Sequence, residues 1–353
     1  RRRVNAAIDR GAAALLRGQE RDGMWRSGAA HYADGVTALC LLALLKAGVK
    51  PEQEGVRKAF ASLRRRPFAQ TYSVACLLMA LEAKYFPGGA DEKSAYRDRP
   101  RLAQRLVSEE DREWIREAAA WLVAQQGAGF PAPARPLHPV WRYPYGGYDL
   151  SNTQYALFGL SSANRCGVPT SKAWLPALRY LIGAQEKDGP IVEVTRYARR
   201  GEQLERRYEQ AKARGFGYVL DDQPYGSMTS AGLCSLVLCQ QALDRNSVFN
   251  QSYRDKTRSA IRDALAWLQE YYDLEENVFR GDSWWLYYLF NVERSGALLD
   301  MRYLGSHDWY LEGAELLLAA QSADGAFGTS VDTSFAILFL KRATVPALTN
   351  PLR

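Results

Sequence analysis

The stretch that decides the fold is residues 310–340, YLEGAELLLAAQSADGAFGTSVDTSFAILFL. Its first half places apolar residues three or four apart, which is typical of an amphipathic helix. The sequence Gln321-x-x-Asp324-Gly325 then ends that helix in a turn. Beyond Asp332 the chain is apolar on every side, and such a helix has to be buried all round. The stretch therefore predicts a half-exposed outer helix followed by a buried inner helix.

The same pattern recurs along the whole chain. The apolar frame of each outer segment is centred on Ala12, Phe60, Ala118, Leu178, Leu265 and Ala314. The apolar partner segments begin near Asp34, Thr71, Asp149, Ser227, Asp282 and Asp332. A unit of roughly 50 residues that occurs six times indicates a repeat-built body. Because residues 190–195 carry the only plausible strand signal, we predict an all-α protein of twelve helices.

We expect a single domain over residues 1–353, because no linker rich in Gly, Ser or Pro divides the repeats. Three segments exceed the minimal unit, at about 86–112, 127–148 and 190–214. The first is predicted to be a surface loop with a short helix, and the second to be irregular. The third should contain a charged helical run over 201–214. A long insertion of this kind is typical of a lid or a docking surface, and a tolerated surface loop is an equal alternative.

Composition excludes several classes of function. The 353 residues are 47% hydrophobic and 24% charged, as in an ordinary globular protein. The net charge of +7 is scattered in short clusters without interleaved aromatic residues, so no nucleic-acid partner is expected. The five cysteines lack metal-ligand spacing, and we predict buried thiols, no metal site and no cofactor. No apolar run reaches membrane-spanning length. The chain begins with Arg, which is compatible with further sequence or additional domains beyond it.

The turn motif resembles the QW repeat of the squalene-hopene and oxidosqualene cyclases. The residues that carry it are Gln19-x-x-Asp22-Gly23-x-Trp25 and Gln321-x-x-Asp324-Gly325-x-Phe327-Gly328. The helix pairing is similar to that in the β subunits of protein prenyltransferases. The resemblance implies a single (α/α)6 toroid, in which six parallel inner helices are surrounded by six antiparallel outer helices. It places the chain in the terpenoid cyclase and protein prenyltransferase superfamily as a divergent member.

The chain departs from the active-site motifs of both families. Cyclases protonate an alkene with the middle acid of Asp-x-Asp-Asp-Thr-Ala, whereas the matching stretch here, 329–334, has Val331 at that position. Prenyltransferases hold zinc with Asp-x-Cys and a His, for which this chain has Asp282-Ser283-Trp284 and, near the His position, Asp332. The standard cyclase acid and the zinc ligand set are therefore both missing.

Parallel inner helices would bring six N-termini, with their unpaired N–H groups, to one rim of the barrel. Acidic and aromatic residues near these ends should surround a central cavity. The predicted ligand-binding residues are Trp284, Trp285, Tyr288, Tyr155, Tyr72, Asp34, Asn152 and Trp141. The structural alternatives are core filling by the aromatic rings and helix N-capping by the acids.

We predict that this cavity binds an apolar or isoprenoid-like small molecule, or an extended peptide. One alternative is a divergent terpenoid cyclase or transferase that uses Asp332 or Asp282 as the acid or cation partner. A second alternative is a protein-interaction domain of a larger protein, with the charged insertion 201–214 as its docking surface. The sequence leaves open whether the protein is an enzyme and where it resides.

Overall fold

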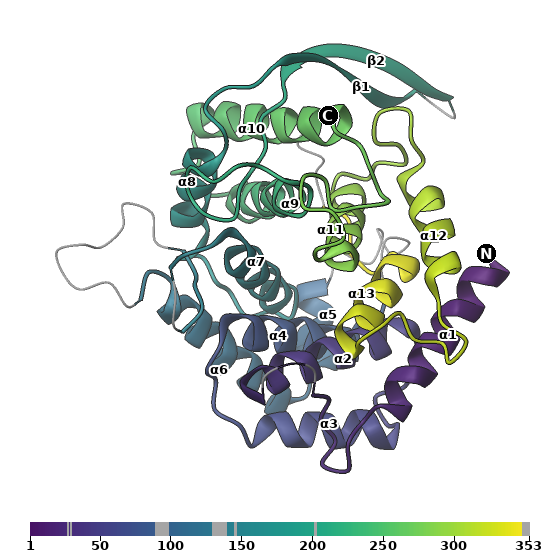
Figure 1. Cartoon of the computed structure of the whole chain (residues 1–353). Helices are drawn as coiled ribbons and strands as arrows, with labels where there is room; N and C mark the ends of the chain where they lie inside the picture. The colour runs from purple at the N-terminus through teal and green to yellow at the C-terminus, as the bar shows by residue number, and fades with distance from the viewer. Residues whose placement is uncertain are drawn as a thin grey trace.

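The computed structural model describes residues 1–26, 28, 30–88, 99–128, 140–144, 147–200 and 203–347. Two concentric rings of helices form the body (Figure 1). The inner helices are α2 (Ala33–Ala47), α4 (Thr71–Tyr85), α7 (Leu150–Arg165), α9 (Gly226–Leu243), α11 (Trp285–Leu298) and α13 (Ser330–Lys341). The outer helices are α1 (Arg2–Arg17), α3 (Glu54–Arg64), α6 (Glu109–Gln125), α8 (Trp174–Ala184), α10 (Gln251–Glu270) and α12 (Trp309–Ala320).

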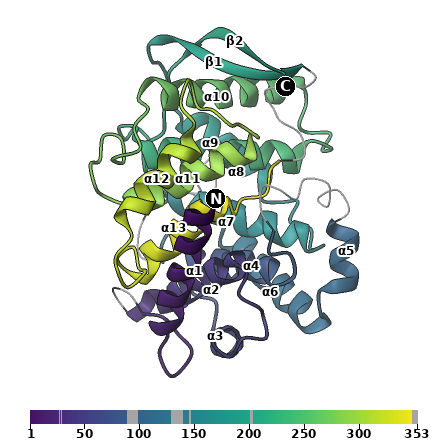
Figure 2. The same ribbon diagram turned by 90° about the vertical axis from the view of Figure 1, so that its right-hand side faces the viewer.

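The inner ring is closed. Contacts run from α2 to α4, α7, α9, α11 and α13 in turn, and α13 packs back against α2. The first and last repeats also lie side by side, because α1 contacts both α12 and α13 (Figures 1 and 2). The predicted all-α toroid is thus confirmed, with every predicted outer and inner segment found as a helix.

The two rings differ in burial as their residue patterns require. Along α9 each residue from Gly226 to Cys239 is buried, so this helix contacts protein on all sides. In α1 the buried residues recur three or four apart, and the opposite face is exposed. Two inner helices begin at side-chain caps. Asp149 accepts the Asn152 N–H at α7, and Thr329 with Asp332 forms a capping box at α13.

The repeated Gln residues join neighbouring units. Each donates its amide Nε2 to two backbone carbonyls, one within or beside its own turn and one in the next outer helix. The pairs are Gln19 with Gly23 and Gly55 (both 2.8 Å), Gln185 with Arg214 (3.0 Å) and Ala260 (2.9 Å), and Gln321 with Gly325 and Ala7 (both 2.9 Å). In the third unit Gln126, rather than the expected Gln125, makes the contact, at 2.9 Å from the Ala173 carbonyl. The Gln of the motif therefore joins each of these repeats to the next through hydrogen bonds.

The insertion at 190–214 differs from its prediction. It is an antiparallel hairpin of β1 (Ile191–Arg200) and β2 (Gln203–Lys212), so the predicted helical run over 201–214 is wrong. The hairpin lies across α10 (Figures 1 and 2), where Val194 is buried and Thr195 exchanges two hydrogen bonds with Gln269. Strand β1 is rich in β-branched residues, and pairing with it satisfies the backbone hydrogen bonds of residues 203–212. This pairing outweighs the helical preference of their composition.

The other two insertions are described in part. Residues 86–112 contain the short helix α5 (Arg99–Leu106), as expected, and 89–98 lie outside the described residues. Within 127–148, residues 129–139 and 145–146 also lie outside them. Across the described ranges, no helix has both the length and the apolar character needed to cross a bilayer.

Candidate ligand-binding cavity

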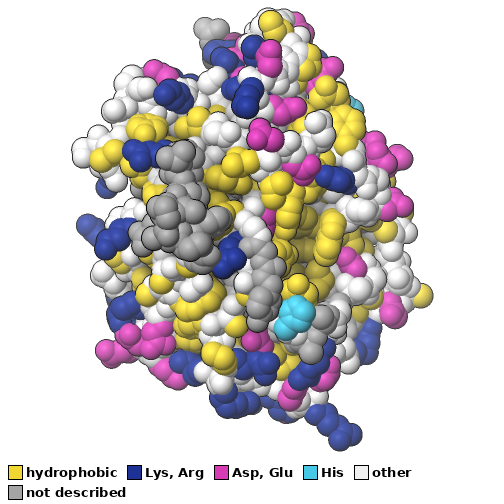
Figure 3. Space-filling view, turned by 60° about the vertical axis from the view of Figure 1, so that its left-hand side comes forward, with side chains coloured by type: hydrophobic (Ala, Val, Ile, Leu, Met, Phe, Trp, Pro, Cys, Tyr) yellow, Lys and Arg dark blue, Asp and Glu magenta, His cyan; other side chains and the backbone are white. Residues whose placement is uncertain are grey.

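A cavity of about 670 Å³ lies at the N-terminal ends of the inner helices, and all six contribute to its wall. A second space, of only about 40 Å³, is lined by residues near the C-terminal ends of the same helices. Because all six helices place their N-terminal residues at one pole and their C-terminal residues at the other, they run parallel. Figure 3 shows a face of the molecule on which hydrophobic side chains gather around a hollow, with charged groups mostly toward its edge.

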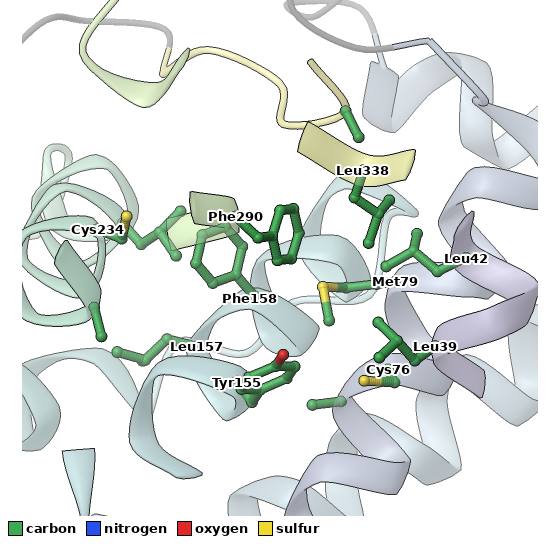
Figure 4. Packing of buried hydrophobic residues seen from close by; sticks show 14 of the residues in the cluster. Leu39, Leu42, Cys76, Met79, Tyr155, Leu157, Phe158, Cys234, Phe290 and Leu338 are labelled. Atoms are coloured by element: carbon green, nitrogen blue, oxygen red, sulfur yellow. The ribbon is translucent and has the colours of Figure 1, made fainter. Parts of the chain in front are cut away.

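The barrel axis below the cavity is filled. Side chains from several inner helices, among them Leu42, Met79, Phe158, Phe290 and Leu338, pack against one another there (Figure 4). Tyr155, 2% exposed, lines the base of the cavity. The Arg294 guanidinium lies on its other side, 5.2 Å from the ring centroid. It is held between Phe158 at 3.9 Å and Phe290 at 4.0 Å. The cavity therefore has a solid floor.

Aromatic rings line the wall in a continuous series, which we call the aromatic arc. Its members are Tyr32, Tyr143, Tyr72, Tyr155, Tyr287 and Phe335. Successive ring centroids are separated by 6.4, 5.4, 4.5, 6.2 and 5.6 Å. These distances fall within the range of favourable aromatic pairs, so the rings support one another.

A chain of hydroxyl groups runs beside the arc. The Tyr72 hydroxyl contacts Ser151 Oγ, which is 2.9 Å from the Tyr287 hydroxyl. Tyr287 in turn donates to Gln154 Oε1 at 2.9 Å, and Gln154 Nε2 donates to Asn291 Oδ1 at 2.8 Å. Burial raises the pKa of Tyr72 and of Tyr287 well above the ordinary value, so both hydroxyls keep their protons. The wall thus combines apolar ring faces with fixed donors and acceptors.

Two of the carboxylates at this end of the barrel bear most closely on the cavity. Asp332 lines the cavity, and its Oδ2 accepts from the Thr329 backbone N–H (3.0 Å) and hydroxyl (2.7 Å). Asp149 lies behind the wall, where its hydrogen-bond partners include Asn152 and the Tyr218 hydroxyl. Burial raises the pKa of Asp149 to about 6. Asp332 sits on α13 and Asp149 at the start of α7, which lies three places away in a ring of six and so on the opposite side.

The structure brings together only part of the predicted site. Tyr72, Tyr155, Trp284 and Asp332 line the cavity. The predicted residues outside its wall are Asp34, Trp141, Asn152, Asp282, Trp285 and Tyr288. Most of these have other partners that account for their positions.

Asp34 pairs with Arg66, and Asn152 donates to Asp149. Each of the three aromatic residues donates to a backbone carbonyl: Trp141 to Leu122 and Trp285 to Leu274 (both 2.7 Å), and Tyr288 to Asp273 (2.8 Å). Asp282 is exposed outside the wall. Of neighbouring residues near the start of an inner helix, some therefore line the cavity and others pack outside it. A position near the rim does not specify which of the two a side chain does.

Several wall residues were not on the predicted list, although they share a simple positional signal. Tyr32 and Tyr225 immediately precede an inner helix, Ser151 and Tyr287 lie in the first turn of one, and Tyr218 follows a repeat turn.

In the cavity wall Cys76 is a buried thiol whose pKa is raised to about 12 by burial, so it stays protonated. Among the described residues, no group of three or more His, Cys, Asp or Glu side chains is placed to hold a metal ion.

Comparison with known proteins gives a similarity in fold. No family model and no curated protein matches the chain. Among solved structures, it is similar to an inactive variant of the α-1,6-mannanase GH76A of Salegentibacter sp. HEL1_6, in complex with α-1,6-mannotriose. The two chains are 11% identical, with a TM-score of 0.58 over 96% of this chain and 98% of that one. At this identity the similarity shows a shared toroid fold.

This finding overturns the predicted membership of the terpenoid cyclase and prenyltransferase superfamily. It also overturns the predicted apolar, isoprenoid-like or peptide ligand, together with the cyclase, transferase and interaction-domain alternatives. The reason lies in the motif that suggested them. Gln19 and Gln321 hold helix ends together at the outer ring, and neither lines the cavity. A turn of this kind reports how repeats are joined and carries no information about the lumen.

The mannanase was inactivated by two Asp-to-Asn substitutions at neighbouring positions. The adjacent aspartates of this sequence, Asp221 and Asp222, lie in the loop between two cavity tyrosines but outside the cavity wall. Asp222 Oδ2 accepts from the Tyr218 N–H at 3.2 Å and lies 3.6 Å from Arg280. Asp222 is thus engaged in holding its own loop.

Proposed function

We propose that this protein binds an oligosaccharide in the tyrosine-lined cavity. The observation that carries the proposal is the pairing of the aromatic arc with the hydroxyl chain. A sugar ring has a C–H face that packs on an aromatic ring, and hydroxyl groups at its edge that require donors and acceptors. A wall made of tyrosines supplies both from the same residues. The similarity in fold to a mannanase that holds mannotriose supports the proposal.

The size and the mouth of the cavity fit this ligand class. A volume of about 670 Å³ is within the usual range for small-molecule sites. At the mouth Trp284 is 72% exposed and has a positive φ of 59°, an uncommon conformation for a bulky residue. An exposed indole at the mouth of the aromatic-lined cavity offers a further stacking surface for a sugar that projects from it.

The described carboxylates favour binding over hydrolysis. Glycosidases place two carboxyl groups roughly 5–10 Å apart across the scissile bond. Asp332 is the one carboxylate in the described wall, and Asp149 begins a helix on the opposite side of the ring. Asp149 also lies behind the wall, and its oxygens are engaged with Asn152.

Calorimetric titration with α-1,6-mannotriose and other neutral trisaccharides tests the proposal. We expect saturable binding to the wild-type protein. Trp284→Ala should weaken it about tenfold, equivalent to about 1.4 kcal/mol, which is the scale of one aromatic stacking contact. The matched control is Tyr208→Ala, which removes a 58% exposed ring from strand β2, well away from the cavity. Absence of binding to every trisaccharide, or an equal loss in both variants, would contradict the proposal.

A further inference from the structure

A buried arginine lies beneath the floor of the tyrosine-lined cavity. Arg294 is 1% exposed, and its guanidinium is held between the rings of Phe158 and Phe290. Its Nη2 contacts the Met79 sulfur at 3.7 Å, whereas its Nη1 is buried with no hydrogen-bond partner among the described residues. None of the described carboxylates forms an ion pair with it. A guanidinium keeps its proton in proteins, so burial cannot neutralise this group.

Arg294 borders the small space of about 40 Å³ near the C-terminal ends of the inner helices, which we call the lower cavity. Met79, Phe158 and Phe290, which hold the guanidinium, line the same space (Figure 4). A cavity needs roughly 10–15 Å³ to hold one water molecule. The lower cavity therefore has room for one small ion or for a few water molecules.

The charges around the lower cavity are unbalanced. Its ionic lining residues are Lys46, Glu82, Arg165 and Arg294. Arg165 donates to both carboxylate oxygens of Glu82. Lys46 and Arg165 lie in the last turns of α2 and α7, where a cation offsets the partial negative charge of the helix end. Arg294 precedes the last turn of α11, so its charge has no such match among these residues.

The carboxyl next to Arg294 in sequence does not supply the missing charge. Glu293 does not line the lower cavity, and it accepts from the Thr344 N–H (3.1 Å) and hydroxyl (2.7 Å). Burial raises the pKa of Glu293 to about 7, and the attraction of Arg294 opposes this rise less than the Thr344 hydrogen bonds do. Glu293 is therefore only partly ionised at neutral pH. A buried charge without a full counter-charge is strongly unfavourable, and proteins pair such charges.

From these contacts we infer that the lower cavity binds a small monovalent anion of the size of chloride, with Arg294 Nη1 as its donor. Such an ion supplies the negative charge that the lining lacks and accepts a charge-assisted hydrogen bond from the free N–H. The space is too small for an organic anion such as gluconate. The inference is independent of the oligosaccharide proposal, because Tyr155 separates this site from the cavity above.

Urea denaturation tests the inference as sodium chloride or bromide replaces sodium gluconate at fixed ionic strength. Anion binding to the folded state predicts a halide-dependent rise of the wild-type unfolding midpoint that levels off at saturation, measured relative to Arg294→Met. The general effect of the salts acts on all variants alike. Arg254→Met is the matched control and should keep the rise, because Arg254 stacks on Phe249 (4.7 Å) and pairs with Asp244 (2.7 Å) outside the lower cavity. The same halide dependence in all three proteins would overturn the inference.

A bromide soak locates the ion without any variant. Crystals of the wild-type protein are soaked at the bromide concentration that saturates the stability effect, or at the highest concentration assayed if there is none. We expect an anomalous peak at hydrogen-bond distance from Arg294 Nη1. Density there without an anomalous peak identifies water and overturns the inference, as do peaks confined to surface cations. Neither result bears on whether the tyrosine-lined cavity binds a sugar.

Discussion

Replacing Gln321 with Met tests the hydrogen bonds that join the last repeat to the first. Gln321 Nε2 donates to the Ala7 carbonyl of α1 and to the Gly325 carbonyl, both at 2.9 Å, and its Oε1 accepts from Arg10. This side chain joins the last repeat to the first, across 314 residues of sequence. Methionine has nearly the same length and removes the bonds without opening a large gap.

The expected loss follows from these bonds. Each neutral hydrogen bond contributes about 1 kcal/mol net, and Gln321 is half-buried, so water replaces part of the loss. The free energy of unfolding should fall by about 1–2 kcal/mol. With an unfolding entropy of roughly 2.1 cal/mol/K per residue, a chain of this length should lose about 1–3 °C in Tm. Urea denaturation resolves such a change better than a thermal scan.

Two further variants make the assay specific. Gln185→Met removes the same kind of bond pair between α8 and α10, and because Gln185 is buried it should cost at least as much as Gln321→Met. Gln104→Met changes an exposed residue of α5 and should cost less than about 0.5 kcal/mol. Amide hydrogen exchange in α1 should accelerate in Gln321→Met alone. Equal stability of the Gln321 and Gln104 variants, or unchanged exchange in α1, would refute the reasoning.

Two other predictions concern the core. Burial raises the pKa of Glu293 from 4.5 to about 7. The ionisation of this carboxyl therefore lowers the stability of the fold progressively as the pH rises from 4.5 to 7. Glu293→Gln should raise the free energy of unfolding by up to about 3 kcal/mol above pH 7 and change it little near pH 4. A pH series of urea midpoints checks this, and a pH-independent difference between the two proteins would contradict it. Gly159→Ala should cost about 1–3 kcal/mol, because the added Cβ would lie 2.8 Å from Ala75 Cα where α7 meets α4. A change below 0.5 kcal/mol in its unfolding free energy would show that the helices separate more easily than this packing indicates.

The ring could be predicted from sequence because helix periodicity and repeat spacing are local signals. Ile8, Ala12 and Leu15 mark one buried face, and the same spacing marks the other outer helices. The hairpin at 191–212 was missed in its second half, since residues 203–212 have a helical composition and become a strand only by pairing with β1.

The site was less predictable, because whether a residue lines the wall depends on the direction in which its side chain points. Trp284 and Trp285 are adjacent in sequence, yet Trp284 borders the cavity and Trp285 Nε1 bonds to the Leu274 carbonyl. Tyr218 reaches the wall from a loop, where no periodicity specifies its direction. The ligand class was mistaken because the Gln-x-x-Asp-Gly turn acts at the outer ring, remote from the groups that a ligand would contact.

The most direct test is a crystal structure of the protein soaked with α-1,6-mannotriose. The proposal predicts a sugar ring stacked on the aromatic arc, with hydroxyl groups bonded near Ser151 and Tyr287 and with the chain leaving past Trp284. A cavity that holds only water at saturating sugar, or a sugar bound elsewhere on the surface, would contradict it.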